Sequence, residues 1–112
     1  MIIVSGRVEF DPKQRATALA AASELFEPTR AQLGCLDYVW CPDPSNEGRV
    51  YVYECWEDTE SFAAHLAGPW YKSMLELLGK NGLRGAEVAK HRVEKSEPVY
   101  DETGKPRADF ST

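Results

Sequence analysis

The sequence predicts an α+β domain of the ferredoxin-like type, with the element order β-α-β-β-α-β and both helical regions on one face of an antiparallel four-stranded sheet. Runs rich in β-branched and aromatic residues alternate with segments whose apolar residues recur at helical spacing. Turn-forming residues separate each run from the next. A chain of 112 residues fits one domain, which we expect over residues 1–96, followed by a polar tail over residues 97–112.

The first half of the chain should supply one strand and one helical region. Residues 2–10 form a β-branched run that Asp11 and Pro12 end, and these two residues can begin a helix as its N-cap and first helical position. Apolar residues then recur at helical spacing through an Ala-rich segment. Pro28 lies inside this segment, so the helix is either kinked there or restarted after Glu27, and Gly34 is expected to end it.

The second half should supply a hairpin, two short helices and a last strand. The runs "CLDYVWC" (residues 35–41) and "RVYVYECW" (residues 49–56) flank the turn-forming "PDPSNEG", which predicts two antiparallel strands. Asp58 can cap the next helix, and the pair at residues 68–69, "GP", should break that helical region into two pieces. Residues 85–96 are expected to form the fourth strand.

The strand over residues 49–56 is largely apolar on both faces. Its alternating side chains place Val50, Val52, Glu54 and Trp56 on one face and Tyr51, Tyr53, Cys55 and Glu57 on the other. A sheet that is covered on one side only usually shows a polar outer face, so the second apolar face predicts a homodimer that packs sheet on sheet. We expect the polar tail to reach across this dimer.

Charge and composition disfavour several kinds of partner. The net charge is −5 and the 13 basic residues are scattered, so no basic stripe is available for nucleic acid. No apolar run approaches the length of a membrane span, and no basic segment precedes the first apolar residues, so we expect a soluble cytoplasmic protein. Cys35, Cys41 and Cys55 lack C-x-x-C spacing and are expected to be buried free thiols rather than metal ligands.

Two stretches resemble a known family. "GCLDYVW" at residues 34–40 and "YECWEDTESFAAHL" at residues 53–66 are similar to the antibiotic biosynthesis monooxygenase (ABM) domains, with Glu-x-Trp, an acidic helix start and a His on the next helix. The resemblance covers residues 1–95 of the chain. It implies a dimeric α+β barrel and, as in many members, a cofactor-independent oxygenase of quinols or polycyclic phenols whose pocket lies between sheet and helices.

The second stretch contains the leading candidates for a site. Glu54 is a carboxylate on an apolar strand face and His65 lies on the apolar face of the next helix, so both are expected at one cavity as catalytic residues. The pKa range of His65 suits removal of a phenolic proton. The expected substrate-binding residues are aromatic: Trp56 as a flat wall, Tyr38 as added surface, and Trp70 and Tyr71 as a lid after the "GP" break.

Each of these residues also has a purely structural interpretation. Trp56 can be a core residue, Glu54 can make a structural hydrogen bond, and His65 can be a core histidine with its hydrogen bonds satisfied. The sequence leaves these alternatives open.

The chain departs from parts of the family pattern. Polyketide-modifying members carry an Asn where this chain has Val52. Heme-degrading relatives carry an Asn on the first strand, where this chain has Gly6 and Arg7, so heme is disfavoured. No metal or flavin motif is present, and an electron-rich phenolate can itself give an electron to dioxygen. Two other functions remain open, a non-catalytic dimeric small-ligand-binding protein and an isomerase of a small carbonyl compound.

Overall fold

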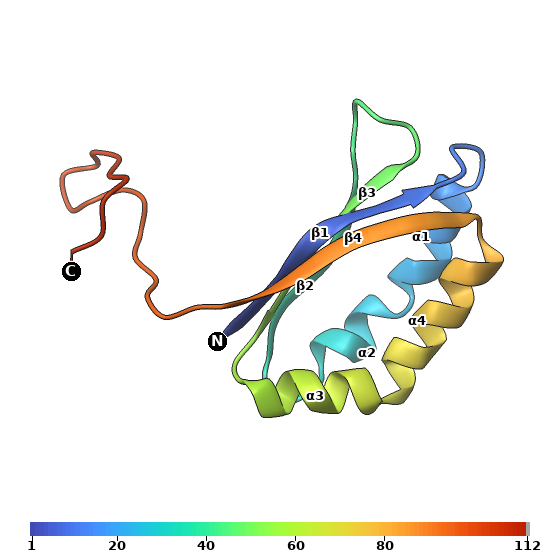
Figure 1. The fold of residues 1–112 in the computed structure, drawn as a ribbon, viewed down its shortest axis with the longest axis horizontal. Helices are drawn as coiled ribbons and strands as arrows, with labels where there is room; N and C mark the ends of the chain where they lie inside the picture. The colour runs from blue at the N-terminus through green and yellow to red at the C-terminus, as the bar shows by residue number, and fades with distance from the viewer. Residues whose placement is uncertain (112) are drawn as a thin grey trace.

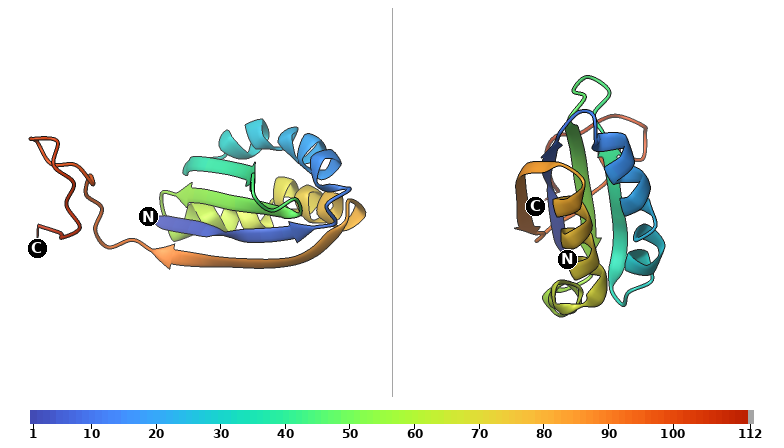
Figure 2. Two further views of the ribbon diagram at one scale, coloured as in Figure 1. Left: turned by 90° about the horizontal axis from the view of Figure 1, so that it is seen from above. Right: turned by 90° about the vertical axis from the view of Figure 1, so that its right-hand side faces the viewer.

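The computed structural model describes residues 1–111 and confirms the predicted α+β ferredoxin-like fold (Figure 1). The strands are β1 (Ile2–Phe10), β2 (Cys35–Pro42), β3 (Arg49–Trp56) and β4 (Leu83–Arg92). The helices are α1 (Arg15–Ser23), α2 (Phe26–Arg30), α3 (Thr59–Ala67) and α4 (Pro69–Lys80). The strands form one antiparallel sheet in the order β2-β3-β1-β4, and the helices lie on one side of it (Figure 2).

Several boundaries differ from the sequence-based prediction: α2 ends at Arg30 rather than at Gly34, and β4 begins at Leu83 rather than at residue 85. The first helical region restarts at Phe26, so Pro28 lies within the first turn of α2. Backbone N–H groups in a first turn have no partner within the helix, so the N–H that proline lacks costs no helical hydrogen bond. Asp11 is not the N-cap of α1, because Gln14 occupies that position and the Asp11 carboxylate accepts from the Lys13 N–H at 3.0 Å. Strand β4 ends at Arg92 rather than residue 96, since its last partner on β1 is Ile2.

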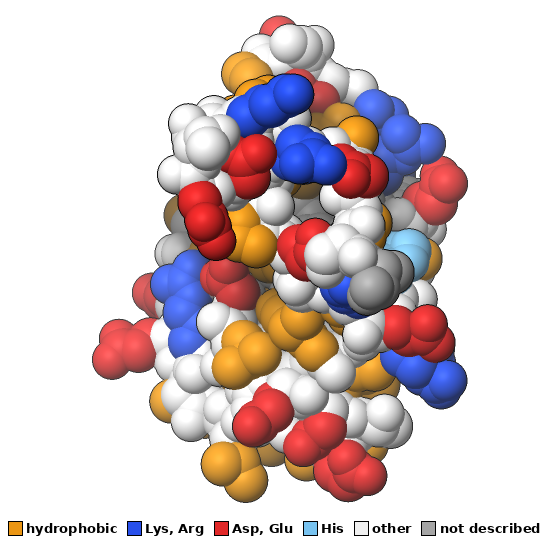
Figure 3. All heavy atoms as spheres, turned by 90° about the vertical axis from the view of Figure 1, so that its left-hand side faces the viewer, with side chains coloured by type: hydrophobic (Ala, Val, Ile, Leu, Met, Phe, Trp, Pro, Cys, Tyr) orange, Lys and Arg blue, Asp and Glu red, His pale blue; other side chains and the backbone are white. Residues whose placement is uncertain are grey.

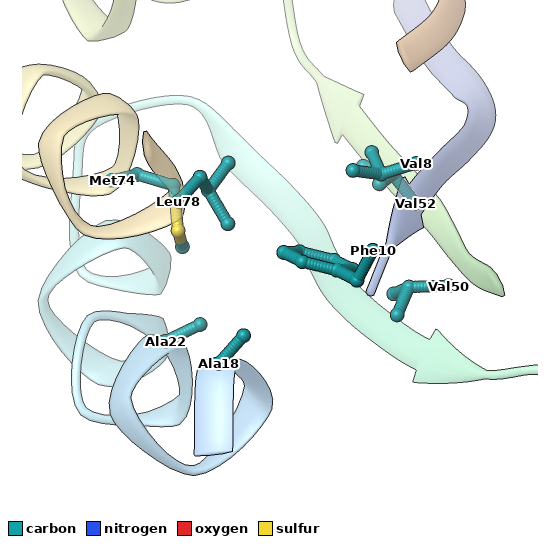
Figure 4. Close-up of a cluster of buried hydrophobic side chains, with 8 residues drawn as sticks. All are labelled: Val8, Phe10, Ala18, Ala22, Val50, Val52, Met74 and Leu78. Carbon is teal, nitrogen blue, oxygen red and sulfur yellow. The ribbon is translucent and has the colours of Figure 1, made fainter. Parts of the chain in front are cut away.

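The core lies between the helices and the covered face of the sheet. Figure 4 shows its two sides meeting, with side chains from β1 and β3 directed toward those from α1 and α4. The buried cluster consists of Val8, Phe10, Ala18, Ala22, Val50, Val52, Met74 and Leu78. The small alanines of α1 allow this helix to pack on α4, and larger side chains from the sheet and from α4 fill the space between the two layers.

The helices α3 and α4 begin as the sequence predicted. The Asp58 carboxylate accepts from the Ser61 N–H at 2.8 Å and from the Ser61 hydroxyl at 2.6 Å, which caps α3. Gly68 is extended and Pro69 is the first residue of α4, so the chain changes direction between the two helices.

A glycine turn connects α2 to β2 and packs on the start of α3. Gly34 has φ +81°, and a Cβ added there would lie 1.9 Å from the Ser61 hydroxyl oxygen. The Glu57 N–H donates to the Gly34 carbonyl at 2.8 Å. These contacts fix the α2–β2 turn relative to α3.

No helix of the described residues covers the opposite face of the sheet (Figure 2). Tyr51 and Tyr53 are 46% and 37% exposed there, and Arg7 pairs with Glu87 at 3.1 Å.

The three cysteines are free thiols, but only Cys55 is buried. The prediction that the other two are buried is wrong, because Cys35 is half-buried and Cys41 is exposed. Both lie on β2, which has a strand neighbour on one side only.

Beyond β4 the chain leaves the body of the domain (Figure 1). A bridge between Tyr100 and Pro106 folds it back on itself, and the Asp101 carboxylate accepts from the N–H of Thr103 and of Lys105 at 2.9 and 3.0 Å. Figure 3, seen from this end of the molecule, shows apolar side chains exposed between acidic and basic ones.

Within residues 1–111, no helix is both long and apolar enough to cross a membrane.

We predict that Gly34→Ala destabilises the domain by about 2 kcal/mol or more, because alanine is strained at this φ and its Cβ collides with Ser61. Urea unfolding monitored by circular dichroism measures the effect. Gly79→Ala is the matched control, since a Cβ at this position in α4 meets nothing within 4 Å and should stabilise the helix by roughly 0.5–1 kcal/mol. Equal unfolding midpoints for Gly34→Ala and the wild type would contradict this account of the turn.

Candidate functional site

A cavity of about 530 Å³ lies between the covered face of the sheet and helices α3 and α4. Its walls are mostly apolar, and its polar lining residues are Tyr38, Trp40, Glu54, His65, Tyr71 and Lys90. Four apolar lining residues that are also exposed, Leu66, Leu75, Leu83 and Val88, place its opening between these helices and β4. A second hollow of about 510 Å³ is lined by tail residues alone and contains no buried titratable group.

Glu54 is the buried carboxylate of this cavity, with 8% of its surface exposed. One oxygen, Oε1, accepts a hydrogen bond from the Trp56 indole N–H at 3.0 Å, and Oε2 makes no hydrogen bond with any described residue. Burial raises the pKa of Glu54 above its ordinary value, and the hydrogen bond from Trp56 opposes this shift. A carboxyl group with a raised pKa and one unoccupied oxygen can accept a proton at a pH closer to neutral.

His65 comes from α3 and is 3% exposed. Its ring stacks on that of Trp56 with centroids 4.7 Å apart and an interplanar angle of 25°. The rings of Tyr38 and Tyr71 meet it edge-on, at 6.1 and 5.7 Å. Burial lowers the pKa of His65, so the imidazole is neutral near pH 7. Three aromatic rings from β2, β3 and α4 therefore hold a neutral imidazole at the cavity wall.

Gln32 is a residue of the site that the sequence did not reveal. Its side-chain nitrogen Nε2 lies 3.0 Å from His65 Nδ1 and donates to the Thr29 carbonyl at 3.1 Å. Gln32 lies in the turn after α2, and the packing of this turn on α3 brings the two side chains together. No motif or spacing connects residues 32 and 65, so only the tertiary structure identifies the pair.

Two aromatic residues of β2 add polar groups to the cavity. The indole nitrogen Nε1 of Trp40 is buried without a well-formed hydrogen bond to any described residue, but it interacts with the Tyr38 hydroxyl. Burial, and then the negative charge of Glu54, raise the pKa of the Tyr38 hydroxyl well above its usual value, and the smaller effect of Trp40 opposes this shift, so this hydroxyl keeps its proton. The cavity thus presents neutral donors around one carboxyl group.

The structure brings four of the six predicted site residues to the cavity wall, namely Glu54, His65, Tyr38 and Tyr71. The expectation that Trp56 lines the cavity is corrected, because its side chain is fully buried between Glu54 and His65 and supports both. Trp70 also lies outside the lining and is 37% exposed on α4, since only one of two consecutive helical residues, here Tyr71, faces the sheet.

The fold and the cavity define a class, a ferredoxin-like α+β domain with a carboxyl group and an imidazole at an apolar cavity. The family model of antibiotic biosynthesis monooxygenases (ABM) matches residues 1–77, and the chain belongs to this family.

Solved structures share this fold at low sequence identity. A Deinococcus radiodurans protein named as a candidate antibiotic biosynthesis monooxygenase superimposes with a TM-score of 0.82 at 20% identity, covering 90% of this chain and 100% of that one. A Nitrosomonas europaea protein, also named as a candidate antibiotic biosynthesis monooxygenase, superimposes with a TM-score of 0.76 at 12% identity. The match covers 85% of this chain and 100% of that one. An uncharacterized Synechocystis protein is 20% identical over 88% of this chain and 67% of its own length.

We predict that Glu54→Gln makes the domain more stable than the wild type at pH 7–8 and that this gain shrinks toward pH 4. Burial raises the pKa of Glu54 in the folded state above its unfolded value. The protonated carboxyl group therefore contributes its full stability below the unfolded pKa, and this stability is lost as the pH rises through the folded pKa. Glutamine cannot ionise, and its amide oxygen still accepts from Trp56. Thermal unfolding across this pH range measures the difference.

Glu76→Gln, an exposed change on α4, is the control for the loss of one negative charge and should show no such pH dependence. A stability difference between Glu54→Gln and the wild type that stays constant or falls as pH rises would contradict the burial of an ionisable carboxyl group.

Proposed function

We propose that this protein is a cofactor-independent monooxygenase that oxidises a small electron-rich aromatic, a quinol or polycyclic phenol, with dioxygen. The observation that carries the proposal is the apolar cavity in which Glu54 keeps one oxygen without a partner beside the neutral imidazole of His65. Family membership supports the reaction type. A volume of about 530 Å³ is within the range of small-molecule sites and fits a two- or three-ring compound.

The chemistry needs little from the protein. A cavity group removes a proton from the substrate, and the resulting anion transfers one electron to dioxygen. The two radicals combine to a substrate peroxide, whose O–O bond breaks to leave one oxygen on the ring and one in water. An anthrone thus becomes an anthraquinone, and a naphthohydroquinone becomes a hydroxynaphthoquinone, each with one dioxygen consumed and one water formed. The apolar wall keeps bulk water from the intermediates.

Tyr38, supported by Trp40, offers a donor where the family pattern is incomplete. Position 52, an Asn in polyketide-modifying members, is Val52 here, and its partner across the β2–β3 pair is Trp40. Trp40 lines the same cavity, and its buried indole N–H interacts with the Tyr38 hydroxyl, which also belongs to a lining residue. In this proposal the Tyr38 hydroxyl, supported by Trp40, replaces the missing amide as a donor to the reduced oxygen.

We predict that the protein consumes dioxygen with 1,4-naphthohydroquinone or anthrone faster than the protein-free solution does, in buffer treated with a chelator. Loss of the proton-accepting carboxyl group in Glu54→Gln should lower the rate by about 10²–10⁴-fold, whereas Glu76→Gln should leave it unchanged. His65→Ala should also slow it. An oxygen electrode together with product chromatography gives both rate and stoichiometry.

Uptake equal to autoxidation across a panel of such quinols and phenols would end the oxygenase hypothesis. A thermal shift with a ligand recovered unchanged would then favour the binding protein. Turnover under nitrogen would favour the isomerase.

We infer that the uncovered face of the sheet packs on a second copy of the chain. Tyr51 and Tyr53 expose large aromatic surfaces in the middle of this face, and a shallow hollow lies beside Arg7 and Glu87. The tail leaves the body at the end of β4 with Val99, Tyr100 and Phe110 exposed, so it can extend the interface by crossing to the partner.

We predict that light scattering at micromolar concentration gives twice the chain mass for the wild type and a single chain mass for Tyr51→Lys combined with Tyr53→Lys. Two ammonium groups at the centre of an aromatic interface would have to lose their hydration without partners. Thr17→Lys, on the exposed side of α1, is the control and should remain dimeric. A monomeric wild type would overturn the inference.

A further inference from the structure

We propose that Gln32 fixes His65 as a hydrogen-bond donor toward the cavity, so that His65 holds a substrate oxygen and Glu54 takes the substrate proton. This assignment deepens the proposed oxygenase function and rests on it. It reverses the role that the sequence suggested for His65, which was removal of the proton. Gln32 acts through His65 and is therefore a positioning residue.

The orientation of the Gln32 amide is fixed by its second partner. Its nitrogen donates to the Thr29 carbonyl at 3.1 Å, and a rotated amide would place its oxygen against that carbonyl oxygen. The same nitrogen lies 3.0 Å from His65 Nδ1. An amide nitrogen has two hydrogens and cannot accept, so one hydrogen points at Thr29 and the other at His65.

The amide determines which nitrogen of His65 carries the proton. Since Nδ1 must accept from Gln32, the neutral ring carries its hydrogen on Nε2. A doubly protonated ring would direct an Nδ1–H at the amide N–H, which is repulsive, and burial independently lowers the pKa of His65. His65 is thus a neutral donor, and its lone pair is already in use.

The ring has little freedom to exchange its two nitrogens. It is stacked on Trp56 at 4.7 Å and meets the edges of Tyr38 and Tyr71. Its other nitrogen, Nε2, makes no hydrogen bond with a described residue, while His65 lines the cavity. The Nε2–H group is therefore available to a ligand.

The same wall leaves one acceptor. Trp56 occupies Oε1 of Glu54, and Oε2 has no partner among the described residues. The pair fits a flat phenol or hydroquinone whose ring oxygen can hydrogen-bond to His65. In the first step the substrate O–H bond breaks, its proton bonds to Glu54 Oε2, and the electron pair stays on the substrate oxygen, where the Nε2–H of His65 stabilises it.

Nitrogen NMR of His65 tests the assignment without any substrate. In protein with ¹⁵N-labelled histidine, whose two imidazoles are distinguished with His91→Gln, we expect His65 to carry its proton on Nε2 and none on Nδ1 at pH 7. Gln32→Glu places a carboxylate of the same size against Nδ1 and should move the proton to Nδ1. Gln14→Glu, the same change at the start of α1, is the control and should leave His65 as in the wild type.

A wild-type His65 protonated on Nδ1, or a Gln32→Glu protein with the wild-type tautomer, would overturn the proposal. With 1,4-naphthohydroquinone, Gln32→Glu should lower kcat roughly ten- to a hundredfold with a smaller change in KM. Unchanged kcat in a variant with the moved proton would overturn the donor role. An Nε2–H tautomer without oxygen uptake would instead refute the proposed function alone and leave the role of Gln32 standing.

Discussion

The cavity depends on the side chain of Trp56. Its indole N–H donates to Glu54 and its ring stacks on His65, so one buried residue holds a carboxyl group from β3 and an imidazole from α3. Because Trp56 lies beneath both groups, it orients them without occupying cavity volume. The bond also explains how an apolar strand can carry Glu54, since it satisfies one oxygen of a group that is costly to bury.

Two local constraints bring the other groups to Trp56. The Asp58 cap begins α3 immediately after β3, which carries His65 back over the strand that holds Glu54. Gly34 lets the preceding turn lie against the cap, and this contact places Gln32 beside His65. The polar geometry of the cavity is thus set by two chain reversals that meet at Ser61, outside the cavity itself.

Local chemistry made most of the fold predictable from the sequence. The alternation in β3 identified both faces of the sheet, and Asp58 and Gly68 marked helix boundaries, because each acts on its own neighbours in the chain. The end of β4 was predicted wrongly because it depends on a distant part of the chain: β4 stops at Arg92, which pairs with Ile2 at the start of β1. Glu54 and His65 could be predicted because a polar residue on an apolar face is unusual. Gln32 could not be, since an exposed turn explains a glutamine equally well, and the depth of Trp56 follows only from packing.

Folding alone does not account for the carboxyl group of Glu54. A glutamine would accept the same bond from Trp56, and an apolar side chain would avoid desolvating a charge. The burial that raises its pKa also keeps His65 neutral and the Tyr38 hydroxyl protonated, so one apolar environment produces a proton acceptor and neutral donors together. Such a set matches a substrate that loses a proton and keeps negative charge on oxygen. Under the proposed function, chemistry at the cavity is the reason that this apolar strand carries an ionisable group at position 54.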